Sequence, residues 1–176
     1  MHPARRFAAD HFLNRELSLL AFNRRVLAQA ADDRVPLLER LRFLCIVSSN
    51  LDEFFEIRVA GLKEQLKLDS HAVGADGLAP GDVFRRVTEQ AHELIREQYA
   101  LLNDVILPAL EKEGIAFFRR SLWTDEQRAW IREFFINEVM PVLTPIGLDP
   151  SHPFPRVLNK SLNFAVELEG RDAFGR

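Results

Sequence analysis

The chain has 176 residues, of which 47% are hydrophobic and 28% are charged. A chain of this length and composition can bury a sizeable core, which excludes a disordered protein. Its 23 basic and 26 acidic residues give a net charge of -3, which argues against a surface that grips nucleic acid through its phosphates.

The single cysteine, Cys45, excludes an intramolecular disulfide framework and favours a reducing compartment. No segment reaches the roughly 20 apolar residues that a membrane span needs, and the N-terminal residues lack the apolar run of a secretory signal. We therefore expect a cytoplasmic protein, either free or peripheral to the inner face of the membrane.

Three segments have apolar residues spaced three or four positions apart, the pattern of helices packed on one side. The first covers residues 15–32, with Asn14 as its N-cap, and the second follows Pro36 and runs to about Lys67. The first segment is expected to pack through Leu19, Phe22, Val26 and Ala30, with Leu20, Leu27 and Ala31 beside them. The stripe of the second consists of Leu37, Leu41, Leu44, Leu51, Phe55, Leu62 and Leu66.

The third segment covers residues 83–112, with Asp82 as its cap, and follows a glycine-rich loop over 69–81. Its stripe is Phe84, Val87, Ala91, Leu94, Gln98, Leu101 and Val105, and Pro108 should bend or fray its last turn. The two long segments each span roughly 45 Å at 1.5 Å per residue. Matched lengths predict an antiparallel hairpin with the first helix in its groove.

The pattern changes after Gly114. Residues 115–118 are a short apolar run typical of a strand, and Thr124 with Gln127 predicts a capping box before a helix that ends near Met140. Prolines then recur up to Pro155, and residues 162–169 alternate apolar and polar side chains as a half-buried strand does. That strand has no partner within the chain.

The fold class expected from these patterns is mainly α. An N-terminal antiparallel helical bundle of three helices, two of them long, occupies residues 12–114, and residues 115–176 are the incomplete beginning of an α+β domain. Nucleotide-binding glycine motifs, HExxH and GxSxG are all absent from the sequence. The five histidines are scattered along the chain, so we expect no catalytic or metal-binding residue in it.

Small polar residues interrupt the second helix at Ser48, Ser49 and Asn50. From spacing alone we favour capping, because Ser49 with Asp52 and Asn50 with Glu53 both fit the capping-box pattern and would let the helix restart there. The alternative is that the Asn50 amide, which offers a donor and an acceptor on one short side chain, points into a cleft and matches the edge of a purine base.

Charged residues around this interruption allow two weaker interpretations. Asp52, Glu53 and Glu56 could bind a metal or act as acid and base, but solvated ion pairs with Arg58 or Lys63 fit them better. The cations that could meet phosphates together are Arg40, Arg42 and Arg58, although surface ion pairing is the simpler role. In its apolar context, Cys45 is expected to be a small core residue.

The longer motifs resemble one family. FLNRELSLLAFNRRVL at 12–27 and PLLERLRFLCIVSSNLDEFFEIRVAGLK at 36–63 resemble the start of polyphosphate kinase, the histidine-phosphorylated type that makes inorganic polyphosphate from ATP. VMPVLTPIGLDPSHPFP at 139–155 and LNKSLNFAVELEG at 158–170 are similar to that family's passage into its head domain.

The resemblance implies a large multidomain enzyme that reversibly transfers the terminal phosphate of ATP to polyphosphate through a phosphohistidine, with magnesium. It implies that the asparagine directly before LDEF, here Asn50, contacts ATP, and it therefore reverses the preference for capping. The nucleophilic histidine and the magnesium ligands are expected outside this chain, which is not expected to be active alone. The implied partners are ATP, ADP, inorganic polyphosphate, the remaining domains of the enzyme and other copies in a homo-oligomer, but no nucleic acid.

A different expectation stays open beside this one. The helices could form a structural module that packs against other domains or a second subunit, without any direct contact between Asn50 and ATP.

Overall fold

The computed structural model describes residues 7–68, 73–148, 151, 153–158, 161–167, 169 and 170. The chain divides into two compact units, the first ending at Phe118 and the second beginning at Arg119. All regular structure in the described ranges is helical, so the prediction of a mainly α chain is confirmed.

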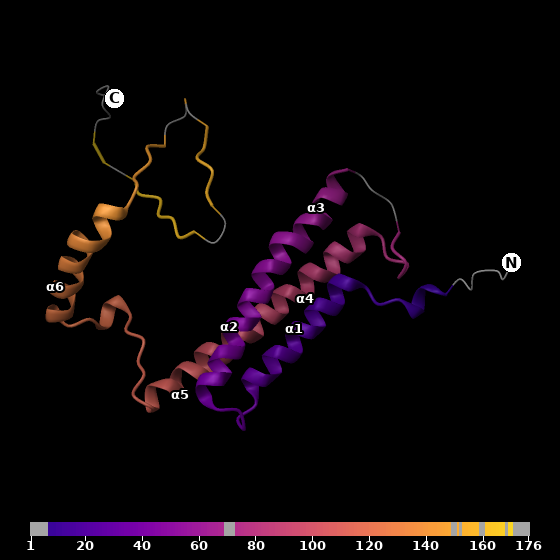
Figure 1. Ribbon diagram of the computed structural model, residues 1–176, viewed down its shortest axis with the longest axis horizontal. Helices are drawn as coiled ribbons and strands as arrows, with labels where there is room; N and C mark the ends of the chain where they lie inside the picture. Colours follow the sequence, from indigo (N-terminus) through magenta and orange to yellow (C-terminus); the bar gives the residue numbers. More distant parts are fainter. Residues whose placement is uncertain are drawn as a thin grey trace. The chain divides into compact units, whose positions relative to one another are not determined.

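The first unit is an antiparallel helical bundle (Figure 1). Its segments are α1 (Arg15–Ala31), α2 (Leu37–Glu53), η2 (Phe54–Val59), α3 (Ala60–Lys67), α4 (Pro80–Leu101), η3 (Leu102–Ile106) and α5 (Leu107–Lys112). The π-helical segments η2 and η3 join α2 to α3 and α4 to α5, which produces the two long helices that the sequence predicts. Helix α1 packs against both α2 and α4, as expected for a helix in the groove of a hairpin.

A side-chain cap fixes the beginning of α1. Asn14 Oδ1 accepts a hydrogen bond from the Leu17 N–H at 3.0 Å, as predicted, and Asn14 Nδ2 donates to Asp76 Oδ2 at 2.6 Å. The bond from Asn14, supported by the Leu78 N–H, lowers the pKa of Asp76 below its ordinary value. The loop before α4 is therefore attached to the start of α1.

The predicted cap of α4 is wrong. Asp82 lies in the first turn of the helix, which begins two residues earlier at Pro80 and has Ala79 as its N-cap. Proline is favoured in a first helical turn because the N–H that it lacks has no partner there, and this preference decides the start.

In each π-helical segment the buried face differs by one residue from the predicted stripe. The predicted stripe contains Phe55, but Phe54 is 6% exposed and Phe55 is 38% exposed. In the other long helix the predicted Val105 is 42% exposed, whereas Ile106 is fully buried. A π turn holds more residues than an α turn, which accounts for the later buried position at Ile106. Phe54 is the first residue of η2, and the regular spacing of three residues from Leu51 already turns it inward.

The buried stripe of α1 shares Ala30 with the predicted stripe and otherwise follows residues that lie beside it. It consists of Leu20, Asn23, Leu27 and Ala30, while Leu19 and Phe22 are partly exposed.

Cys45 is exposed, so its prediction as a core residue is wrong. Successive residues on a helix are about 100° apart, and the buried neighbour Leu44 turns Cys45 away from the core.

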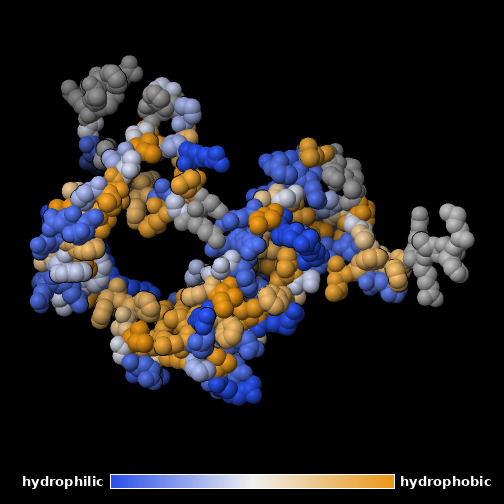
Figure 2. Space-filling model, in the orientation of Figure 1, coloured by the Kyte–Doolittle hydropathy of each residue, from blue (hydrophilic) through white to orange (hydrophobic). Residues whose placement is uncertain are grey.

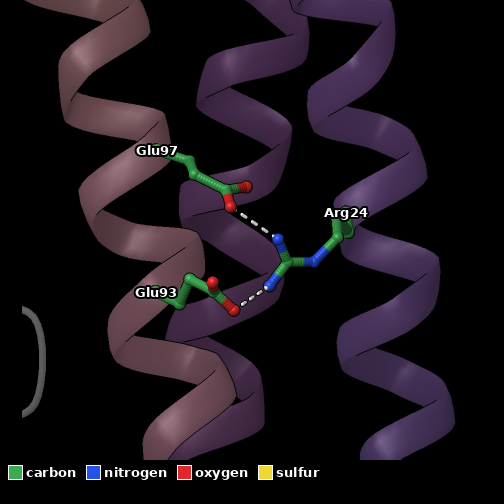
Figure 3. Close-up of polar contacts among 3 residues, drawn as sticks. All are labelled: Arg24, Glu93 and Glu97. Atoms are coloured by element: carbon green, nitrogen blue, oxygen red, sulfur yellow. Dashed lines mark hydrogen bonds and ion pairs between the residues drawn. The ribbon is translucent and has the colours of Figure 1, made fainter.

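Ion pairs connect α1 to α4 across the surface of the bundle. Arg24 lies between Glu93 and Glu97, which are one turn apart on α4, and bonds their carboxylates at 2.9 and 2.6 Å (Figure 3). Arg24 is the neighbour of Asn23, so the rotation that brings Arg24 to α4 also directs Asn23 into the bundle.

The second unit has local structure without a core. Helix α6 (Asp125–Phe134) begins with the predicted capping box of Thr124 and Gln127, and continues through η5 (Phe135–Val139) and η6 (Met140–Val142). None of the described residues after Arg119 is buried, and hydrophobic side chains lie at the surface, as Figure 2 shows for one face.

Neither expected strand forms in the described parts of the chain. Residues 115–118 and 161–167 have no regular structure, and Leu168 lies outside the described residues. A strand must pair its backbone N–H and C=O groups with a neighbour, and no second strand is present among the described residues.

Candidate functional site

A pocket of about 200 Å³ opens on the first unit between α1, α2 and η2. It lies beside the polar interruption of the second helix. Its lining residues are Leu19, Leu20, Phe22, Asn23, Asn50, Leu51, Glu53, Phe54, Ile57 and Arg58. The walls are thus mainly apolar, and two amides and two opposite charges provide polar contacts.

The two amides are hydrogen-bonded to each other. Asn50 Nδ2 donates to Asn23 Oδ1 at 3.1 Å, and Asn23 Nδ2 donates to the Val47 carbonyl oxygen at 3.1 Å. Asn23 is 3% exposed and Asn50 is half-buried at the pocket. These two hydrogen bonds form a relay from Asn50 through Asn23 to Val47. The Asn50 Oδ1 atom takes part in neither bond, so it can accept a hydrogen bond from a molecule in the pocket.

Asn50 does not cap a helix. Helix α2 runs without a break from Leu37 to Glu53, and the Ser49 and Asn50 positions lie inside its last two turns. The predicted restart at Ser49 is therefore wrong, and the irregular turn begins at Phe54 instead. An amide inside a helix is free to serve a side-chain contact because no backbone N–H depends on it for a cap.

The π-helical segment η2 shapes the other side of the pocket. It contributes Phe54, Ile57 and Arg58, which are three of the lining residues. Short π segments inside α-helices are frequent at functional sites, because the wider turn changes the direction of the side chains that follow.

The three arginines considered together in the sequence do not form one cluster. Arg58 lines the pocket, whereas Arg40 lies 18 residues earlier, about 27 Å along the helix at 1.5 Å per residue. Arg40 Nε donates to the Ala30 carbonyl oxygen at 2.8 Å, and Arg42 pairs with Glu39 at 3.6 Å. Of the three, Arg58 alone is placed to meet a ligand in this pocket.

The carboxylates of Asp52, Glu53 and Glu56 do not form a metal site in the described part of the chain. Among the described residues, no group of three or more His, Cys, Asp or Glu side chains could hold a metal ion. Asp52 and Glu56 have interactions within the chain, and Glu53 lies at the pocket. The exposed His11 is near Asp10 and the exposed His92 lies on α4, while His2, His71 and His152 fall outside the described residues.

Two buried amides lie in the helical stripes: Gln98 was expected in the stripe of its helix, whereas Asn23 was not singled out in the sequence. Asn23 interrupts the buried stripe of α1, and Gln98 Nε2 donates from α4 to the Leu44 carbonyl oxygen and to Ser48 Oγ, both at 3.1 Å. A polar residue within an otherwise apolar helical stripe is a usable signal, since a buried amide costs free energy unless it is hydrogen-bonded. The predicted stripe of α1 followed neighbouring residues, which placed Asn23 beside it.

Family models match the chain over most of its length. The polyphosphate kinase N-terminal domain matches residues 12–118, and the polyphosphate kinase middle domain matches residues 126–176. The chain belongs to the polyphosphate kinase family.

Curated polyphosphate kinases are similar over nearly the whole chain. The enzyme from Burkholderia ambifaria is 63% identical over 164 residues, which cover 93% of this chain and 24% of that relative. The enzyme from Neisseria meningitidis serogroup C is 64% identical over 167 residues, covering 95% of this chain and 24% of that relative. The chain thus spans about a quarter of the length of the polyphosphate kinases that it matches.

A solved polyphosphate kinase shares the fold. The crystal structure of the Porphyromonas gingivalis enzyme aligns with a TM-score of 0.68 and 34% identity, over 83% of this chain and 20% of that one. Among the described residues of this polyphosphate kinase segment, no helix is long and apolar enough to cross a membrane.

Proposed function

We propose that this segment positions the base of ATP for a polyphosphate kinase that reversibly transfers the terminal phosphate of ATP to inorganic polyphosphate through a phosphohistidine. Asn50 is the residue that contacts the nucleotide. The observation that carries the proposal is the position of the Asn50 amide at the pocket, half-buried, with its Oδ1 atom available to a ligand.

The size and chemistry of the pocket suit a base better than a whole nucleotide. Pockets for drug-sized ligands occupy about 300–1,000 Å³, and this one is smaller, at about 200 Å³. Leu19, Phe22 and Ile57 offer apolar and aromatic surface for a flat ring. Arg58 is the one arginine of the lining and can meet the negative charge of the phosphates.

This assignment divides the work of the enzyme between its parts. Phosphoryl transfer needs several cations around the phosphates, whereas a base only needs to be held in place. The net charge of -3 and the absence of a metal cluster among the described residues suit positioning. We therefore assign the phosphohistidine and the magnesium ligands to other parts of the enzyme. A homo-oligomer and a cytoplasmic location, or one peripheral to the membrane, belong to the same proposal.

The test is Asn50→Ala in the full-length kinase that carries these residues. Loss of a hydrogen bond to the bound base should raise the KM for ATP about tenfold, with kcat little changed because the base takes no part in the transfer. The melting temperature should fall by only a few degrees, because Asn23 Oδ1 loses its donor while Asn23 Nδ2 keeps its bond to the Val47 carbonyl oxygen. Steady-state kinetics and thermal denaturation measure the two effects.

Asn103→Ala is the matched control, because Asn103 is an exposed amide in η3 outside the pocket lining. It should change neither quantity. A normal KM for ATP together with a lowered melting temperature in Asn50→Ala would contradict the proposal and support the purely structural module.

A further inference from the structure

We propose that Asn23 fixes the orientation of the Asn50 amide and thereby makes the pocket selective for adenine over guanine. This inference rests on the proposed function, because it concerns the base that Asn50 contacts. Asn23 acts as a positioning residue and does not itself have to touch the nucleotide.

The direction of the relay follows from its buried end. The Val47 carbonyl oxygen can only accept a hydrogen bond, so the atom of Asn23 that bonds it at 3.1 Å must be the amide nitrogen. Asn23 therefore presents Oδ1 to Asn50, and that oxygen can again only accept. Asn50 must turn its amide nitrogen toward Asn23, which leaves its Oδ1 as the acceptor for a ligand.

Burial makes the reversed arrangement costly. Asn23 is 3% exposed, so water cannot satisfy its amide if the relay is broken. Rotating the Asn50 amide by 180° would place two carbonyl oxygens against each other and leave a buried acceptor unpaired, which is strongly unfavourable. No buried side-chain nitrogen or oxygen among the described residues lacks a partner, as this account requires.

Contacts with α4 also restrain the rotation of α1. Arg24 follows Asn23 directly and is bonded to Glu93 and Glu97 on α4 (Figure 3). Helix α1 therefore cannot turn to withdraw Asn23 from Val47 without breaking these two ion pairs.

The resulting polarity discriminates between the purines. Adenine carries an amino group, a hydrogen-bond donor, where guanine carries a carbonyl oxygen, an acceptor. A fixed Asn50 Oδ1 accepts from the adenine amino group and repels the guanine oxygen. A free Asn50 amide could rotate and present its amino group to guanine.

The experiment compares kcat/KM for ATP and for GTP in the full-length kinase. Asn23→Leu fills a similar volume but releases Asn50, and should reduce the ratio of the ATP value to the GTP value about tenfold. Asn23→Asp keeps an oxygen that accepts from Asn50 in either protonation state, so the ratio should stay within about twofold of the parent.

Gln98→Leu is the matched control, because it removes another buried amide that donates to a helix carbonyl away from the pocket. It should lower the melting temperature and leave the ratio unchanged. If Asn23→Leu does not fold, Asn23→Ala supports the same comparison, since it also removes the acceptor.

The two proposals fail in different ways. An unchanged ratio in a folded Asn23→Leu or Asn23→Ala variant, with a raised KM for ATP in Asn50→Ala, overturns the orientation role and leaves the ATP contact standing. An unchanged KM in Asn50→Ala overturns the ATP contact itself, and the orientation role falls with it.

Discussion

The two units of the chain differ in what stabilises them. In the first unit, α1 and the two long helices bury a common core that includes Val47, Val87, Leu94, Ile106 and Leu110. In the second, α6 has a complete capping box, yet Trp130 and Phe134 are 64% and 46% exposed and no described residue is buried. Local signals are thus enough to define a helix, but a core needs several elements that cover one another's apolar faces.

The difference between a packed first unit and a second unit with no buried described residue is consistent with a segment that spans about a quarter of the length of its polyphosphate kinase relatives. The first unit contains both the family's N-terminal match and all of the residues that line the Asn50 pocket. Its packing can therefore hold the pocket in shape without contributions from the second unit.

The largest effect should come from the core of the first unit. Leu94→Ala removes a side chain that is 1% exposed and should lower the free energy of unfolding by about 3 kcal/mol. The matched change in the second unit, Leu143→Ala, removes a side chain that is 52% exposed and should cost less than about 0.5 kcal/mol. Urea denaturation followed by circular dichroism measures both. Equal costs would mean that the second unit has a core of its own.

Removal of a helix cap should have an effect of intermediate size, and the effect should differ between the two units. Asn14→Ala removes the cap of α1 and the bond to Asp76, and should lower the free energy of unfolding of the bundle by about 1 kcal/mol. Thr124→Ala should weaken α6 by a similar amount. The loss should appear as a lower helical signal in circular dichroism, while the urea midpoint of the bundle stays unchanged. Thr124→Ser keeps the hydroxyl acceptor and is the control. A shifted midpoint in Thr124→Ala would show that the two units unfold together.

The smallest effect concerns the ion pairs of Arg24. Arg24→Met should cost the bundle about 0.5–1 kcal/mol in dilute buffer and clearly less in 1 M NaCl, because salt screens partly exposed charges. Arg42→Met is the control, since Arg42 pairs only at 3.6 Å within its own helix and is 72% exposed. The urea midpoints at the two salt concentrations measure the difference. A salt-independent loss would point to packing of the Arg24 side chain instead of its charge.

Most helices could be predicted because their signals are local. The Asn14 cap, the capping box of Thr124 and Gln127, and the helical end at Lys67 all depend on residues within one or two turns. The strand expected at 115–118 failed because pairing depends on a distant partner that sequence spacing does not reveal. The predicted stripe failed at Phe55, although Leu62 is buried as predicted, because packing between helices, and not local propensity, decides where a π turn forms.

The candidate site was predictable at Asn50 and not at Asn23. Asn50 stands out because small polar residues interrupt an apolar stretch, and the resemblance to polyphosphate kinase gives it a role. Asn23 stands between Phe22 and two arginines, where a polar residue on a helix is ordinary. Its importance depends on a bond to Val47, which is 24 residues away and joined to it only by the folding of α1 against α2.

The π-helical segment η2 changes the tolerance of one long helix to insertions and deletions. Upstream of it, Asn50 and Leu51 must face the pocket and α1, while downstream Leu62 must enter the core. In an uninterrupted α-helix each added or removed residue turns everything beyond it by about 100°. Since a π turn holds about one residue more than an α turn, loss of one residue between Phe54 and Val59 could be absorbed by conversion to a regular turn, whereas loss of one residue from the regular part of α2 would rotate α3 away from the bundle.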